Sequence, residues 1–440
     1  MQQNEWLQKS LDHLGIKELN DMQQATLKQY EKNDHLVLLS PTGSGKTLAF
    51  LLPLINHLNP DLENKVQALV LAPSRELALQ IESVFKSLKT GYKVNCCYGG
   101  HPMSIEKNNL QHPPAILIGT PGRLVDHIER KNINLENITT LVIDEFDKSL
   151  EFGFEEDMKY IISQLPNLKK KVMTSATQAI EIPAFVELSN TTTINFLHTK
   201  EQQSKLIIKK VVAEKSILDS LFQLLCTLDS GSTLVFCNFK EKVEEVSGYL
   251  KDRGIDNEYF HGGLEQIDRE KALIKFRNGS VRILITSDLA SRGLDIPEIK
   301  NIIHVQLPPQ EDAFTHRNGR TARMNADGMA LIMTEKNESY PAYIDRTMEA
   351  FKVNPNASVP KPSGFTTLYF GKGKKDKLNK VDIVGFLGQK GGLQKDEIGL
   401  IEVKDYFSYA AIKSSKVQEV LKKIRDEKIK NKVTRIEICK

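Results

Sequence analysis

Short apolar runs rich in β-branched residues recur through the first 350 residues, and helix-length amphipathic segments separate them. Examples are LVLLS, TLVIDE, STLVFC and VRILITS. Runs this short are typical of buried parallel strands, and the segments between them are long enough for crossover helices. A polar interval at residues 190–207 interrupts the rhythm. We therefore predict two α/β domains with parallel sheets, at residues 1–200 and 207–350.

The chain changes character after residue 350. Residues 351–363 contain three prolines and little periodicity, which predicts a linker. Residues 364–440 show the order strand, helix, two strands, helix, strand, which is typical of an α+β domain of the RNA-recognition-motif (RRM) type. This last part holds 18 Lys and Arg against 10 Asp and Glu, a net charge of +8 in a chain whose total is +4. The positive charge therefore belongs to the tail domain.

Composition limits the remaining classes of protein. Hydrophobic residues make up 40% of the chain and charged residues 26%, and no apolar run approaches the roughly 20 residues that span a bilayer. The N-terminus lacks the basic start and apolar core of a signal peptide, so we expect a cytoplasmic protein without a membrane anchor. The five cysteines lack metal-ligand spacing and are expected to be reduced core residues.

The octapeptide SPTGSGKT, at residues 40–47, follows a predicted strand and precedes an apolar helix. In that context backbone N–H groups at a helix N-terminus would surround phosphate oxygens. Lys46 would neutralise the β- and γ-phosphates, and the Thr47 hydroxyl would bind Mg²⁺. The residues expected to contact the nucleotide here are Thr42, Gly43, Ser44, Gly45, Lys46 and Thr47. Ser40 stands where the pattern usually has glycine, so an ordinary glycine-rich turn is the alternative.

A second acidic motif, TLVIDEFD, lies about 100 residues downstream. A strand that ends in Asp144 and Glu145 would place one carboxylate beside the Mg²⁺ and the other where it can orient or deprotonate the attacking water. Two acids at a strand end are more often only solvated. Together with the phosphate loop they predict an NTPase site.

The ordered set of motifs resembles that of DEAD-box RNA helicases. In order they are SPTGSGKT, PSRELALQ, YGG, TPGRL, VIDEFD, SAT, TSDLASRGLDIP and HRNGRTAR, and they span residues 40–323. The resemblance implies two RecA-like domains that bind ATP and RNA in the cleft between them. It also implies an RNA-dependent ATPase.

The resemblance assigns further nucleotide contacts. Gln23 lies eight residues after Gly15, as does the adenine-binding glutamine of the family, and Trp6 stands where the family stacks an aromatic ring on the base. Asp295 matches a ribose contact. Arg320 and Arg323 match the arginine fingers of the second domain. For Trp6, a partly buried core position is the alternative.

Other motif residues match RNA-binding or coupling positions. The RNA-binding positions would contact phosphates and 2′-hydroxyls without reading bases. The matched residues are Arg75, Gly99, Gly100, Thr120, Arg123 and Arg292, and Gly262, Gly263 and Ser287 would lie near the path of the RNA. The residues that would couple ATP to RNA or one domain to the other are Asp147, Ser175, Thr177, His316 and Arg317.

The motif DEFD departs from the family, because Phe146 stands where alanine is usual. Its ring must find space near residues 175–177. We expect the chemistry with Mg²⁺ and water to survive, whereas the strength of coupling is open. Ser287 replaces the usual threonine and keeps the hydroxyl.

The tail segment GKGKKDKLNKVDIVGFL and the later DYFSY resemble the C-terminal RNA-binding domain of DbpA-type helicases. That resemblance implies binding to a hairpin of large-subunit ribosomal RNA, with phosphate contacts from Lys372, Lys374, Lys375 and Lys377. A solvated basic loop is the alternative. Tyr406, Phe407 and Tyr409 fall on the predicted third strand and are either base-stacking residues or core residues.

The hypothesis from sequence is an ATP-dependent, Mg²⁺-dependent RNA helicase. Through its tail it would bind ribosomal RNA in a pre-ribosomal particle, as a monomer, and it would unwind nearby duplexes during assembly of the large subunit. One alternative is an ATP-gated RNA clamp or scaffold with weak turnover. A DNA helicase with the same motor is a further one, which the tail disfavours.

Overall fold

The computed structural model describes residues 2–100, 102–177, 182–197, 206–214, 216–288, 299–321, 328–336 and 339–439. The described residues form two compact units, one on each side of residues 198–205. None of the helices in these ranges combines the length and hydrophobicity needed to cross a bilayer.

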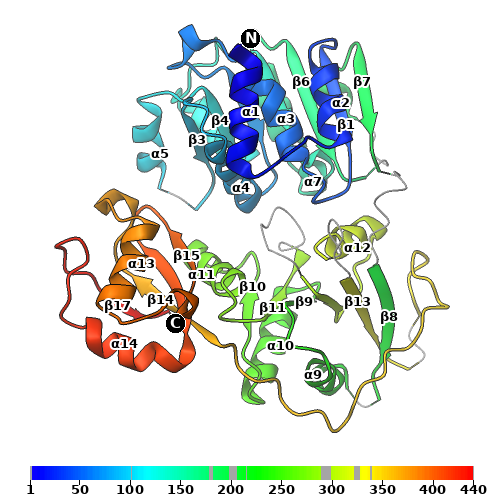
Figure 1. Ribbon diagram of the computed structural model, residues 1–440. Coiled ribbons are helices and arrows are strands. Elements are labelled where there is room, and N and C mark those ends of the chain that lie inside the picture. Colours follow the sequence, from blue (N-terminus) through cyan, green and yellow to red (C-terminus); the bar gives the residue numbers. More distant parts are fainter. Residues whose placement is uncertain are drawn as a thin grey trace. The chain divides into compact units, whose positions relative to one another are not determined.

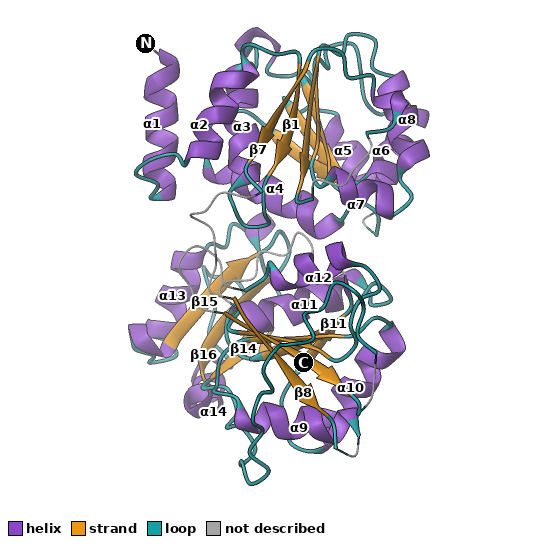
Figure 2. Cartoon of the chain, turned by 90° about the vertical axis from the view of Figure 1, so that its right-hand side faces the viewer, coloured by secondary structure: helices purple, strands orange, loops and turns teal. Residues whose placement is uncertain are grey.

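The first unit is built on a seven-stranded sheet with the order β3-β4-β2-β5-β6-β1-β7, in which every neighbouring pair is parallel. Helices cover both faces of this sheet (Figures 1 and 2). Its strands are β1 (His35–Leu39), β2 (Ala68–Leu71), β3 (Val94–Cys97), β4 (Ile116–Gly119), β5 (Thr140–Ile143), β6 (Lys170–Ser175) and β7 (Thr191–Asn195). Its helices are α1 (Gln2–Leu14), α2 (Asp21–Tyr30), α3 (Lys46–Asn56), α4 (Arg75–Ser87), α5 (Met103–Leu110), α6 (Pro121–Glu129), α7 (Phe146–Glu151) and α8 (Glu155–Ser163).

Alternate residues of each central strand enter different cores. In β5, Val142 packs with residues of α1 to α4, whereas Leu141 and Ile143 pack with residues of α6, α7 and α8. All three are fully buried. Burial on both faces explains why these strands are continuous apolar runs and not alternating ones.

The second unit begins with another parallel sheet, of six strands in the order β10-β11-β9-β12-β13-β8. Its strands are β8 (Leu206–Val212), β9 (Thr233–Phe236), β10 (Glu258–Phe260), β11 (Ile283–Thr286), β12 (Asn301–His304) and β13 (Gly328–Thr334). Its helices are α9 (Ile217–Thr227), α10 (Lys240–Asp252), α11 (Gln266–Arg277) and α12 (Glu311–Asn318).

The tail of the second unit is a four-stranded antiparallel sheet with the order β15-β16-β14-β17. Its elements are β14 (Phe365–Phe370), α13 (Lys380–Gln389), β15 (Ile398–Val403), β16 (Ser408–Lys413), α14 (Val417–Ile424) and β17 (Ile436–Ile438). The order strand, helix, two strands, helix, strand confirms the fold predicted for the tail, and the two parallel sheets confirm the predicted α/β class.

Three edge strands were not singled out by the sequence pattern. These are β7 and β8, which lie in or beside the polar interval, and the short β10. Each lies at the end of its sheet. Because an edge strand has a neighbour on one side only, it does not need the uniform apolar composition of a central strand. In β7, four of the five residues are threonine or asparagine.

The tail sheet packs against α11 of the same unit. Tyr409 is fully buried in a cluster with Ile274 of α11 and Cys439, and the rings of Tyr369 and Phe407 pack against it. Polar contacts flank this cluster. Arg277 pairs with Glu402 at 2.9 Å, and Asn278 donates a hydrogen bond to Thr367 at 2.8 Å.

This packing bears on the aromatic residues of β16. Because Tyr409 is buried, its ring is a core residue of the second unit and presents no surface to a base. Tyr406, just before β16, is 56% exposed.

The contact between α11 and the tail generates a test. Replacing Ile274 by Asp places an unpaired carboxylate in the buried cluster, which costs several kcal/mol and should detach the tail from α11. We expect a broad-specificity protease to cleave residues 354–362 at least several-fold faster in this variant, as followed by mass spectrometry. The control is Val381→Asp, at a side chain that is 78% exposed. Equal cleavage rates in the two variants would contradict the packing.

Candidate functional site

The carboxyl ends of all strands of the first sheet lie at one edge, because the sheet is parallel. Neighbouring strands β5, β6 and β1 lead there into three of the predicted motifs. These motifs are Asp144–Asp147 after β5, Ser175–Thr177 at the end of β6 and the phosphate loop, residues 40–47, after β1. The backbone N–H of Ser40 donates to the carbonyl of Ser175 at 3.0 Å, which ties the phosphate loop to the end of β6.

The phosphate loop turns through two glycines in the left-handed region. Gly43 has φ 82° and Gly45 has φ 92°, and Gly45 immediately precedes the first residue of α3. Lys46 is 8% exposed, and its Nζ donates to the carbonyl oxygens of Ser40 and Pro41, the latter at 3.0 Å. The ammonium group therefore lies inside the loop, where it would meet phosphate oxygens.

The segment before α2 contacts this loop directly. The Gln23 amide nitrogen donates to the Gly45 carbonyl at 3.4 Å, and that of Asn20 donates to the Ser44 carbonyl at 3.0 Å. A Cβ atom at Gly45 would lie 2.6 Å from the Gln23 amide nitrogen and would displace it, and the φ of 92° also favours glycine there. Asn20 and Gln23 also form the capping box of α2. Gln23 is thus held against the phosphate loop.

The two acids after β5 are in different environments. Asp144 is 2% exposed, and its carboxylate accepts hydrogen bonds from the Thr174 hydroxyl and from the Glu145 N–H. Burial raises the pKa of Asp144, although the Thr174 hydrogen bond and the charge of Lys46 oppose that shift. Glu145 has φ 48°, a strained conformation for a non-glycine residue that turns the chain sharply between β5 and α7.

The ring of Phe146 finds its space in the core and not at the site. It is 2% exposed and packs with the residues that join β5 to α6 and α8. The Thr177 hydroxyl lies 3.5 Å from the Asp147 carboxylate and is directed toward it. Burial, with a smaller contribution from the charge of Glu145, raises the pKa of Asp147 to about 6. The bulky residue therefore leaves the contact between residues 147 and 177 in place.

The other half of the same sheet edge carries the predicted RNA contacts. Neighbouring strands β3, β4 and β2 lead to Tyr98–Gly100, to Thr120–Arg123 and to Arg75. The Arg75 guanidinium packs on the two glycines, since a Cβ at Gly99 would be 3.3 Å from it and one at Gly100 would overlap it. The backbone N–H of Thr120 donates to the Cys97 carbonyl at 3.1 Å. The segment after β3 therefore contacts both the start of α4 and the residue that precedes α6.

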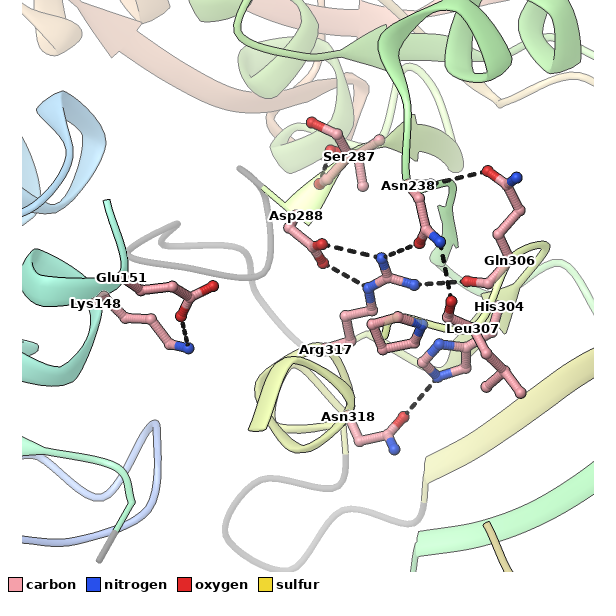
Figure 3. Close-up of polar contacts among 12 residues, drawn as sticks. Lys148, Glu151, Asn238, Ser287, Asp288, His304, Gln306, Leu307, Arg317 and Asn318 are labelled. Carbon is pink, nitrogen blue, oxygen red and sulfur yellow. Dashed lines mark hydrogen bonds and ion pairs between the residues drawn. The ribbon is translucent and has the colours of Figure 1, made fainter. Parts of the chain in front are cut away.

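In the second unit a buried arginine organises the carboxyl edge of the sheet (Figure 3). Arg317 is fully buried and pairs with both carboxylate oxygens of Asp288, at 2.6 and 3.1 Å. It also donates to the Asn238 side chain at 2.8 Å and to the Gln306 carbonyl at 2.7 Å. Burial, together with the charge of Arg317, lowers the pKa of His304 to about 3. The predicted role of Arg317 in coupling the domains stays a prediction, because these contacts all lie within one unit.

The lysine-rich loop of the tail is anchored by its backbone, which leaves its side chains at the surface. The N–H groups of Lys374 and Lys375 each donate at 2.8 Å, to the carbonyls of Lys404 and Asp405. A Cβ at Gly373 would overlap that same backbone, so glycine is required for the close approach. The side chains of Lys374, Lys375 and Lys377 are exposed, whereas Lys372 pairs with Asp376 at 3.2 Å.

Two further lysines join this loop from a distant part of the chain. The Lys430 ammonium donates to the Lys377 carbonyl at 2.8 Å, and that of Lys432 donates to the Asp376 carbonyl at 3.1 Å. Sequence spacing gave no sign that they would meet the loop. The loop and these two lysines are called the tail basic surface below.

Comparison with known sequences matches all three parts of the chain. Residues 20–184 match the DEAD/DEAH box helicase family, residues 216–325 the helicase conserved C-terminal domain and residues 367–438 the DbpA RNA binding domain. The chain is 32% identical to the ATP-dependent RNA helicase DbpA of Bacillus subtilis, over 97% of this chain and 96% of that protein. It is also 32% identical to DbpA of Escherichia coli, over 98% and 96%.

The chain belongs to the DbpA-type DEAD-box RNA helicases. It is therefore an ATP-hydrolysing RNA helicase with an RNA-binding domain at its C-terminal end.

Solved structures of DEAD-box proteins are also similar to this chain. Saccharomyces cerevisiae Dbp5 bound to RNA and ADP BeF3 is 26% identical, with a TM-score of 0.67 over 76% of this chain and 88% of that one. Mss116p bound to single-stranded RNA and AMP-PNP is 25% identical, with a TM-score of 0.68 over 76% and 72%.

Some predicted site residues of this DbpA-type helicase lie outside the described residues. They are Arg292, Asp295 and Arg323, and the side chain of Trp6. The other predicted finger, Arg320, is described and is 3% exposed, and the predicted coupling residue His316 is 4% exposed.

Sequence reasoning also missed residues that the structure places at the site. Asn20 could have been found, because asparagine three residues before Gln23 matches the capping-box pattern. Asn238 had no recognisable signal.

The residues present fit a Mg²⁺ ion. Thr47 and Asp144 would supply a hydroxyl and a carboxylate, which are the hard oxygen ligands that this ion binds, with phosphates and water completing its shell. A buried carboxylate whose pKa is raised by burial is the environment that a cation stabilises. When bound, the ion would neutralise charge on the phosphate oxygens.

The raised pKa of Asp147 predicts how stability depends on pH. Its protonated form favours the folded state, so that contribution is present below the ordinary pKa near 3.8 and is lost as pH rises through about 6. Asp147→Asn, which stays neutral, should stabilise the chain at pH 7.5 by about 3 kcal/mol. In thermal unfolding of the full chain, the gain should shrink as pH falls below about 6 and should vanish only below the ordinary pKa near 3.8. The exposed Glu155→Gln is the control, and a gain independent of pH would contradict the assignment.

Proposed function

We propose that this helicase acts in assembly of the large ribosomal subunit. The tail would bind a hairpin of ribosomal RNA, and the motor would unwind short duplexes near it. The observation that carries the proposal is the tail basic surface, on a domain that matches the DbpA RNA binding domain. The protein would act in the cytoplasm as a monomer on a pre-ribosomal particle.

The proposed division of work follows the three predicted domains. Residues 1–200 would bind ATP and RNA at one sheet edge, residues 207–350 would bring Arg320 and Arg323 to the γ-phosphate, and residues 364–440 would select the RNA. Arginine fingers of this kind stabilise the charge that develops on a transferring phosphoryl group.

Within the ATP site each acid would have its own task. Lys46 would hold the β- and γ-phosphates, Asp144 would face the Mg²⁺ and Glu145 would orient and deprotonate the attacking water. The sharp turn at Glu145 supports this separation, because it directs successive side chains into different surroundings.

The RNA-contacting half of the edge favours binding without base readout. Arg75 and Arg123 are cations suited to phosphates, and the glycines at 99 and 100 would let a sugar-phosphate backbone approach closely. A motor that does not read sequence would need a separate domain to find its target, and the tail supplies one.

The alternative of a clamp with weak turnover rested on Phe146. Its ring lies in the core, and the contact between Asp147 and Thr177 is retained. No observation therefore favours the clamp over the helicase.

The role of Glu145 can be tested by a change that keeps its shape. Glu145→Gln removes the base but leaves the phosphate loop and Asp144 intact. We expect ATP turnover to fall at least 100-fold while binding of a fluorescent ATP analogue persists. Turnover within a few-fold of the wild type would exclude Glu145 as the base.

The proposed target can be tested through the tail basic surface. Replacing Lys374, Lys375 and Lys377 by Gln should raise, at least tenfold, the concentration of a ribosomal hairpin fragment that half-saturates ATP hydrolysis. It should also lower the salt dependence by about two released ions. Replacing Lys422 and Lys423, two exposed lysines of α14, serves as the control.

Comparison of the ribosomal hairpin fragment with an unrelated RNA tests whether the tail selects its target. Stimulation by an unrelated RNA should change little in the triple variant. If the hairpin and the unrelated RNA stimulate equally in the wild type, the ribosomal target is wrong although the ATPase assignment stands.

A further inference from the structure

A buried carboxylate lies beneath the RNA-contacting half of the first sheet. Glu106, on α5, is 2% exposed and accepts hydrogen bonds from the loop after β3 and from the first turn of α6. Its Oε2 accepts from the Nε of Arg123 at 2.7 Å, and its Oε1 accepts from the backbone N–H of Tyr98 at 3.1 Å. One side chain thus links the loop that contains Gly99 and Gly100 with the first turn of α6, which carries Arg123.

A third donor completes the arrangement. The Nε2 of His127 lies 2.8 Å from the same Oε2, and the Asn132 amide nitrogen lies 3.2 Å from the Nδ1 of His127. Since an amide N–H₂ can only donate, Nδ1 is the acceptor and Nε2–H donates to Glu106. The Nε2–H of His127 thus gives the Glu106 carboxylate a third hydrogen bond.

The carboxylate is held in its charged form. Burial acts to raise the pKa of Glu106, but the hydrogen bonds from His127, Arg123 and Tyr98 together lower it below the ordinary value. Hydrogen bonds to a charged acceptor are about twice as strong as neutral ones. Hydrogen bonds to a charged acceptor therefore fix the loop after β3 and the first turn of α6.

A metal site is the other interpretation of this cluster. In the described part of the chain, Cys97, Glu106 and His127 bring their ligand atoms within 4.8 Å of one another. However, Oε1 is bonded to the Tyr98 N–H and Oε2 to both a guanidinium and an imidazole N–H. The positive charge of Arg123 repels a cation, and burial keeps the Cys97 thiol protonated by raising its pKa. The cluster is a hydrogen-bonded support and not a metal centre.

We infer that Glu106 is a positioning residue for RNA binding. By fixing the Nε of Arg123 it sets the plane of the guanidinium, and by holding the Tyr98 N–H it sets the path of the chain into Gly99 and Gly100. Groups ordered before binding lose less conformational entropy when RNA arrives. The inference rests on the proposed RNA contacts of Arg123 and of the two glycines.

Three substitutions of Glu106 distinguish a role in positioning Arg123 and Tyr98 from a role of its negative charge alone. Glu106→Gln keeps the length and an acceptor oxygen, Glu106→Asp keeps the charge but shortens the reach, and Glu106→Ala removes both. For an unstructured RNA, positioning predicts that the concentration giving half-maximal ATPase stimulation rises about threefold for Gln, more for Asp and at least tenfold for Ala. A purely electrostatic role predicts the reverse order for Gln and Asp.

The KM for ATP serves as a second measurement. A general loss of structure would raise it as much as it raises the half-saturating RNA concentration. We expect the half-saturating RNA concentration to rise at least three times more than the KM for ATP in Glu106→Asp. Equal changes in both would overturn the inference. Glu129→Ala, an exposed acid on α6, is the matched control. If Glu106→Ala fails to fold, the order of Gln and Asp still decides.

Arg123→Ala distinguishes failure of this inference from failure of the proposed RNA site. If Arg123→Ala leaves the half-saturating RNA concentration unchanged, the RNA contact itself is wrong. If Arg123→Ala raises it and the Glu106 variants do not, only the positioning role is wrong. In the double variant of Glu106→Asp and Arg123→Ala, positioning predicts an effect well below the product of the two single effects. A full product would contradict it.

Discussion

The parallel direction of the strands in the first sheet is the constraint on which the rest of the structure depends. All its strands point the same way, so every loop that carries a motif emerges at one edge. The strand order β3-β4-β2-β5-β6-β1 divides that edge into two halves. The loops after β3, β4 and β2 hold the proposed RNA contacts, and those after β5, β6 and β1 hold the proposed ATP contacts. A helicase needs both ligands on one rigid support, and here the support is a single ladder of backbone hydrogen bonds.

The two halves meet between β2 and β5. The backbone N–H of Asp144 donates to the Leu71 carbonyl at 2.9 Å, which extends the ladder to the acid that would face Mg²⁺. Four residues after Leu71, α4 begins at Arg75, whose guanidinium packs on the glycines at 99 and 100. On the other side, the Thr174 hydroxyl donates to Asp144, and Ser175 and Thr177 hydrogen-bond to one another. Only a few hydrogen-bonded residues therefore separate the proposed ATP contacts after β5 from the proposed RNA contact at Arg75.

The fold class and the ATP half of the site could be predicted from sequence because their signals are local. A glycine-rich loop between a strand and a helix, and two acids at a strand end, each fall within eight residues. The edge strand β7 gave no apolar signal, since it is exposed on one side. Glu106 and His127 lie 21 residues apart, and their hydrogen bond depends on how α5 and α6 pack, which no local pattern encodes. Lys430 and Lys432 join the tail basic surface from more than 50 residues away for the same reason.

We propose that ATP and RNA bind to one shared edge of the first sheet and therefore bind cooperatively. The most direct test is the dissociation constant of an unstructured RNA, measured with and without a nonhydrolysable ATP analogue, together with that of the analogue with and without RNA. The account predicts that each ligand tightens the other at least tenfold, about 1.4 kcal/mol, and by the same factor in both directions. An RNA affinity that does not change when the analogue is added would contradict it.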